Sequence, residues 1–186
     1  MLALGMPGLT MADSDFPTVE GSYQITADWA LVLPGRFHVR FEDDSLVLWR
    51  KGLTAWIIAW NNDRKETRHE RWDWLRAHSA PGAFDSVSMM DGGILRYAYR
   101  LEEPRAEGVV HALYAYAIGG EGHVQMGIYF DHPADLECAK GIWKSLREGP
   151  PPAPPVAAEA SATAAPAYCP RRSLRLRWPG AHPPVA

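Results

Sequence analysis

Two stretches of the sequence carry side chains of the types that bind metal ions. His69, Glu70 and Asp73 lie close together on a predicted helix, but the zinc-protease pattern needs a second histidine at the position of Asp73. This spacing favours charged residues on a helix surface. Asp131, His132 and Asp135 fit the start of a helix, where they would cap backbone amides. We therefore predict no metal site and no cofactor.

Motifs for nucleophilic catalysis and phosphate binding are also missing from the sequence. No serine lies in a Gly-x-Ser-x-Gly turn. Cys138 lies inside a predicted helix without an activating neighbour, which favours a buried structural thiol. The run Gly119-Gly120-Glu121-Gly122 lacks the Gly-Lys-Ser/Thr ending of a phosphate loop, and a predicted strand follows it. With no catalytic residue predicted, the sequence favours a protein that is not an enzyme.

The tyrosines suggest an interaction surface instead. Residues 109–130 hold two apolar runs around the glycine-rich turn, which predicts a β-hairpin. A turn centred on Gly120-Glu121 places the tyrosines on one face, with Tyr114 opposite Gly127. The other face is apolar, and its small residues Ala115 and Ala117 would let the last predicted helix approach closely. Tyrosine and arginine are enriched at protein interfaces. The candidate interaction surface is Tyr114, Tyr116, Gln125 and Tyr129, extended by Arg96 and Arg100 if their strand pairs alongside.

Two alternatives remain open for the aromatic residues. The tyrosines would belong to the core if Trp72, Trp74 or the N-terminal segment covered them. The tryptophans of the first half, Trp49, Trp56 and Trp60, would either line an apolar ligand pocket or pack in the core.

Composition excludes several classes of partner. Residues 1–148 contain 21 acidic and 15 basic residues, so this part has a net charge of −6, which argues against nucleic acid as the main partner. Two cysteines form neither a disulfide framework nor a zinc set. The N-terminus has no basic residue before Arg36, and we see no signal peptide and no membrane span. These features indicate a cytoplasmic protein.

The pattern of apolar residues predicts strands followed by helices in an α+β domain. The segment Thr54–Trp60 has apolar residues on both faces, which predicts a central strand covered on both sides. Pro34-Gly35 predicts a turn, and residues 102–108 predict a polar loop. Helices are predicted from the capping box at Thr67 to about His78, and from Asp135 to Leu146 with Gly149 as the stop. The other predicted strands are 22–25, 29–33, 37–41, 46–49 and 94–101.

We expect an antiparallel sheet of about six or more strands covered by two helices. The domain should span residues 21–148. Residues 1–20 are predicted to lack fixed structure, and residues 149–186 form a Pro- and Ala-rich segment that we interpret as a disordered tail.

The element order over residues 22–147, with a hairpin before the last helix Asp135–Leu146, resembles the Mog1/PsbP-like α/β/α sandwich, also seen in DcrB-like bacterial proteins. The resemblance implies a binding or assembly role. We interpret the chain as a non-enzymatic bacterial binding or adaptor protein, with an immunity role among the options, that meets a protein partner. The alternative is a small-molecule binder or a hydrolase that uses an aromatic pocket on the sheet.

Overall fold

The computed structural model describes residues 16–105 and 108–149, which form one large antiparallel sheet with two helices. The predicted tail beyond Gly149 lies outside the described residues. The elements are β1 (Thr18–Gln24), β2 (Trp29–Glu42), β3 (Ser45–Arg50), β4 (Leu53–Asn61), α1 (Arg68–Ala77), β5 (Phe84–Asp91), β6 (Ile94–Arg105), β7 (Gly108–Ile118), β8 (Gly122–Phe130), α2 (Leu136–Lys144) and β9 (Arg147–Glu148).

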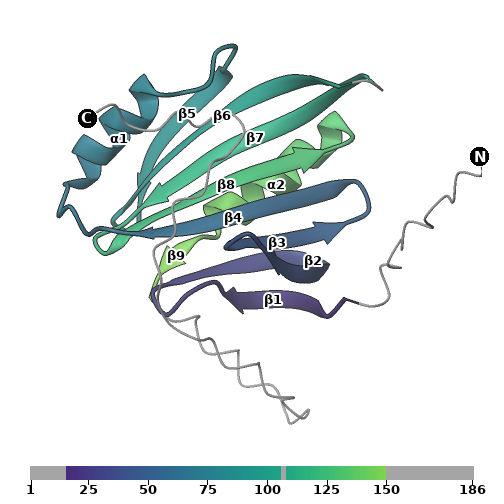
Figure 1. Ribbon diagram of the computed structural model, residues 1–186, viewed down its shortest axis with the longest axis horizontal. Coiled ribbons are helices and arrows are strands. Elements are labelled where there is room, and N and C mark those ends of the chain that lie inside the picture. Colours follow the sequence, from purple (N-terminus) through teal and green to yellow (C-terminus); the bar gives the residue numbers. More distant parts are fainter. Residues whose placement is uncertain (1–15, 106–107, 150–186) are drawn as a thin grey trace, which may run out of the picture.

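The sheet consists of two antiparallel meanders joined side by side. Its strand order is β1-β2-β3-β4-β8-β7-β6-β5, and β9 adds to β2. Each meander is built from hairpins between strands that are neighbours in sequence, and β4 pairs with β8 where the two meet (Figure 1). The sheet has nine strands, so the predicted α+β class is confirmed and the sheet is larger than the six strands named as a minimum.

The hairpin predicted around Gly120-Glu121 has the register that the sequence indicates. Tyr114 pairs with Gly127 and Ile118 with His123. Two glycines of its turn lie close to other parts of the chain. A side chain at Gly122 would overlap the backbone carbonyl of Trp60 on β4, and one at Gly119 would overlap the carboxylate of Glu148. That carboxylate accepts hydrogen bonds from the turn amides of Gly120 (3.0 Å) and Glu121 (2.7 Å), which ties β9 to the turn.

Helix α2 packs on the small-residue face of this hairpin, as predicted. Ala115 and Ala117 are fully buried there and let the helix approach closely. Trp143 is 0% exposed, and its indole N–H donates to the backbone carbonyl of Tyr116 at 2.9 Å. The main core therefore lies between α2 and this face of the sheet.

Helix α1 lies against the other face of the sheet, at the end formed by β5, β6 and β7 (Figure 1). Its buried Leu75 packs against Tyr97, Tyr99 and Tyr116, whose side chains alternate with those that face α2. Each face of the sheet therefore carries one helix, and α1 covers only part of its face. The capping box predicted at Thr67 is present.

Several predicted boundaries are wrong because strands run through residues that usually mark turns. Pro34-Gly35 lies inside β2, where the register against β1 shifts and the extra residues bulge. β6 continues to Arg105 and includes Pro104. A proline fits there because β5 pairs only with the first part of β6, so the edge of β6 that faces β5 has no strand partner beyond Arg100. β1 begins at Thr18, inside the segment predicted to lack structure.

Two further predictions about packing need correction. Helix α2 ends at Lys144, and the chain forms β9 before it reaches Gly149. β4 is central but is not covered on both sides: Ile57 is buried, whereas Trp56 is half-buried and Trp60 is 40% exposed. The second face of β4 lies beyond the part that α1 covers.

Candidate interaction surface

The part of the sheet that α1 leaves open carries aromatic side chains on three adjacent strands. Trp56 on β4 pairs with Gly127 on β8, which in turn pairs with Tyr114 on β7. A glycine thus separates two aromatic residues in one row across the sheet. We use the name aromatic patch for the half-buried side chains Trp56, Ile58, Tyr114, Gln125 and Tyr129.

The tyrosines of the aromatic patch are joined by hydrogen bonds. The hydroxyl groups of Tyr114 and Tyr129 lie 2.9 Å apart, and Tyr114 donates to the carboxylate of Glu103 at 2.8 Å. The guanidinium of Arg105 lies 5.8 Å from the centre of the Tyr129 ring. Burial, chiefly, raises the pKa of both tyrosines, so their hydroxyls stay protonated and can donate. The patch therefore combines apolar rings with fixed polar groups at its β6–β7 side.

Tyr116 does not belong to the open surface. It is 7% exposed and packs in the cluster under α1 with Leu75 and Tyr97, and Trp72 packs against that cluster. Burial also raises the pKa of its hydroxyl. Tyr116 therefore follows the alternative interpretation, in which the helix covers the tyrosine and places it in the core.

Arg96 and Arg100 lie on the opposite face from the tyrosines. β6 pairs with β7 so that Arg96 meets Ala117 and Arg100 meets Leu113, both on the α2 side. Because side chains alternate along a strand, Tyr97 and Tyr99 take the places expected for the arginines. The predicted surface is therefore divided: Tyr114, Gln125 and Tyr129 are together, and the two arginines are elsewhere.

Arg96 instead completes the end of α2. It is 3% exposed and donates to the backbone carbonyls of Trp143 (3.2 Å) and Leu146 (2.6 Å). Burial lowers the pKa of its guanidinium, and Asp91 at 3.9 Å opposes this shift. Carbonyls at a helix end lack partners within the helix, so this arginine has a structural role.

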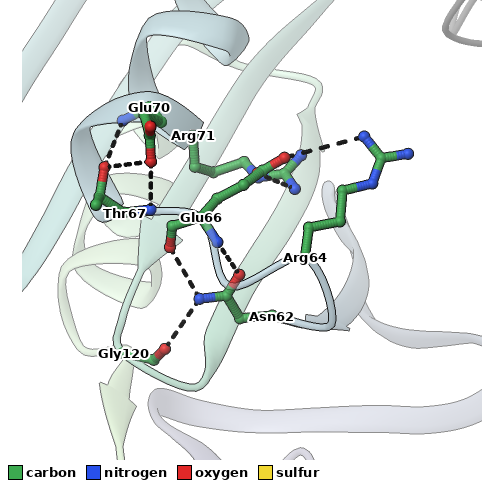
Figure 2. A network of polar contacts seen from close by, with 7 residues as sticks. All are labelled: Asn62, Arg64, Glu66, Thr67, Glu70, Arg71 and Gly120. Atoms are coloured by element: carbon green, nitrogen blue, oxygen red, sulfur yellow. Dashed lines mark hydrogen bonds and ion pairs between the residues drawn. The ribbon is translucent and has the colours of Figure 1, made fainter.

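A polar network fixes the start of α1 against the β7–β8 turn (Figure 2). The side-chain amide of Asn62 donates to the carbonyls of Glu66 (2.9 Å) and Gly120 (3.3 Å). The carboxylate of Glu66 forms an ion pair with Arg71 on the helix. These contacts hold α1 at one end of the sheet and so determine which part of the aromatic face stays open.

His123 lies beneath this network, and its burial makes stability depend on pH. It is 8% exposed, and loss of hydration together with the charge of Arg71 lowers its pKa to about 3. The unfolded chain would bind a proton at this histidine below its ordinary pKa of about 6.5, whereas the folded chain would not. This contribution to stability is present above about pH 6.5 and is lost as the pH falls towards 3.

We therefore expect His123 to reduce the free energy of unfolding by about 2 kcal/mol between pH 7 and pH 5. His123→Gln removes the titrating group, so the variant should lose about 2 kcal/mol less than the wild type over this interval. Urea unfolding at both pH values, followed by circular dichroism, measures the difference. An identical pH dependence in the two proteins would contradict the buried, neutral histidine.

The tryptophans of the first half of the chain, Cys138 and His132 are the other residues that the sequence singled out. Trp49 is half-buried against Phe16, with ring centres 4.9 Å apart. Trp56 is half-buried and Trp60 is 40% exposed, so none of the three belongs to the buried core, which was one of the two alternatives for them. Cys138 is also only half-buried and accepts a hydrogen bond from Arg50 at 3.3 Å. His132 caps the helical turn after β8, as expected.

Within residues 16–105 and 108–149, no group of three or more His, Cys, Asp or Glu residues is arranged to hold a metal ion. In the same part of the chain, neither helix has the length and apolar character that crossing a membrane requires. Neither a protein-family model nor a curated protein matches the sequence.

Proposed function

We propose that this protein is a non-enzymatic binding or adaptor protein that engages a protein partner through the aromatic patch. The observation that carries the proposal is the row formed by Trp56, Gly127 and Tyr114 on the uncovered part of the sheet. The large rings on either side of the buried Gly127 offer a partner contact area. Such aromatic residues supply much of the energy at protein interfaces.

The polar groups of the patch favour a protein over an apolar ligand. The hydrogen-bonded pair of Tyr114 and Tyr129, next to Glu103, holds donors and acceptors in fixed directions. Gln125 adds a side-chain amide to the same face. Interfaces that form and dissociate in water combine rings with polar ends in this way. The resemblance to Mog1/PsbP-like proteins, which are mostly binding or assembly proteins, agrees with the proposal.

The alternative of a ligand pocket walled by tryptophans has less support. A hollow of about 220 Å³ lies beside α2, on the other face of the sheet from Trp56 and Trp60. Its lining contains neither of these residues, so the aromatic patch is better suited to a broad contact than to an enclosed small molecule.

The proposal is tested by comparing two substitutions of exposed or half-exposed aromatic residues by arginine. Tyr129→Arg places a charge in the aromatic patch. Phe41→Arg makes the same kind of change at a residue that is 63% exposed on the α2 side of the sheet. Both variants should fold, as near-UV circular dichroism can verify.

Immobilised wild type and Phe41→Arg should retain the same protein from an extract of the source cells, and Tyr129→Arg should lose it. Calorimetric titration with the purified partner should then show roughly a tenfold or greater loss of affinity for Tyr129→Arg. Equal binding by all three proteins would overturn the assignment of the aromatic patch.

A further inference from the structure

The hollow beside α2 has an apolar interior. Val87 and Met89 of the edge strand β5 form one side, and Leu113 and Trp143 form the inner wall. The space exists because α2 packs mainly over β2, β7 and β8, away from the edge strand. Its volume of about 220 Å³ is below the usual range for drug-sized ligands. It suits a molecule of small size.

The rim of the hollow is basic. Arg100 of β6 and Lys140 and Lys144 of α2 line it, with Asp85 as the acidic residue among the lining side chains. Lys140 and Lys144 are one helical turn apart, so both reach the same side of α2. Three cations and one carboxylate leave an excess of positive charge, although the folded part of the chain is acidic overall. The rim therefore favours an anion.

The arginine of the rim is held in place by neighbours that leave donors available. The guanidinium of Arg100 donates to Asp85 at 2.8 Å and lies 4.7 Å from the centre of the Phe84 ring. One carboxylate contact uses only part of the donor set of a guanidinium. Lys140 contacts Glu137 at 2.8 Å, and the side chain of that glutamate is 77% exposed. Exposed ion pairs of this kind are weak and exchange readily.

We propose that this hollow binds a small monocarboxylate with a short apolar body. The carboxylate would lie at the basic rim, because a charged donor binds a carboxylate more strongly than it binds a neutral acceptor. The apolar body would lie against the half-buried side chains of Val87 and Met89 and remove their surface from water. The volume equals the liquid share of about seven water molecules, which fits a chain of about six carbons.

Hexanoate is the probe for this site, with hexanamide as a neutral molecule of nearly the same shape. Saturation-transfer NMR and calorimetric titration should show that hexanoate binds the full chain and that hexanamide binds roughly tenfold or more weakly. Inorganic phosphate should not displace hexanoate, because it cannot fill the apolar interior. Lys140→Gln combined with Lys144→Gln should weaken hexanoate binding by roughly tenfold or more.

Neighbouring methionines provide a matched pair of variants. Met89 lines the hollow, whereas Met90 is 54% exposed and faces the other side of β5. Met89→Trp should fill the space and abolish hexanoate binding, and Met90→Trp should bind like the wild type. Tyr129→Arg should also bind hexanoate normally, which separates this test from that of the aromatic patch.

Three results would each overturn the proposal: no binding of hexanoate to the folded wild type at millimolar concentration, equal binding of hexanamide, or unchanged binding by Met89→Trp.

Discussion

Trp143→Ala is expected to lower the free energy of unfolding by about 3–5 kcal/mol. The indole is 0% exposed between α2 and the sheet, so its removal leaves a cavity that rigid strands cannot fill. It also leaves the carbonyl of Tyr116 without the hydrogen bond from the indole N–H. Denaturant unfolding followed by circular dichroism measures the loss as a shift of the midpoint.

Trp74→Ala is the matched control for this experiment. Trp74 lies on the outer side of α1, is 40% exposed and stacks on His78. Because little apolar surface is lost from the core, the change should cost less than about 1 kcal/mol. Similar losses for the two variants would show that α2 does not occupy the position described.

Arg96→Met is expected to cost about 3 kcal/mol, the second largest effect. Methionine keeps much of the volume but donates no hydrogen bond, so the carbonyls of Trp143 and Leu146 lose their charged donor in a buried place. A hydrogen bond from a charged group contributes about 1.5–3 kcal/mol, and two are lost here. Urea unfolding at pH 7 provides the measurement.

The other arginine of the same strand face serves as the comparison. Arg100→Met removes an ion pair with Asp85, whose side chain is 62% exposed, so the cost should be below about 1 kcal/mol. Arg96→Lys keeps the charge but not the planar pair of donors, and we expect intermediate stability. If Arg96→Met were as stable as Arg100→Met, the helix-capping role of Arg96 would be excluded.

The hairpin could be predicted in detail because its information is local. A short glycine-rich turn between two strands fixes the pairing, so the faces of Tyr114 and Ala115 follow from alternation alone. The small residues then indicated where a helix approaches, and Trp143 lies there. The start of α1 was equally local, since Thr67 and Glu70 form the capping box within one turn.

The position of the arginines could not be predicted because it depends on a pairing that the sequence does not specify. Arg96 alternates with Tyr97 along β6, and either residue could face the tyrosines until the register with β7 is known. Once that register is set, Tyr97 joins the tyrosines and Arg96 faces α2. The sequence around Arg96 did not indicate that its side chain is buried, because the carbonyls to which it donates are distant in sequence.

Edge strands and long strands were the other elements that the sequence did not reveal. β5 pairs with a single neighbour and has mixed exposure, so its residues show no clean alternation of apolar and polar types. In β2, Pro34-Gly35 is accommodated by a bulge, which depends on the neighbouring strand and not on the dipeptide itself. The cover on a strand face also depends on distant elements, so the sequence of β4 did not show that α1 leaves one of its faces partly exposed.

The junction between β4 and β8 has a consequence for synthesis of the chain on the ribosome. β4 (Leu53–Asn61) emerges well before its partner β8 (Gly122–Phe130), and the whole second meander is made in between. During that interval the apolar segment Thr54–Trp60 presents an unpaired strand edge, the kind of edge that pairs with other chains. Rapid translation of residues 62–130 would shorten this exposure, so the fold links the yield of native protein to the speed of its own elongation.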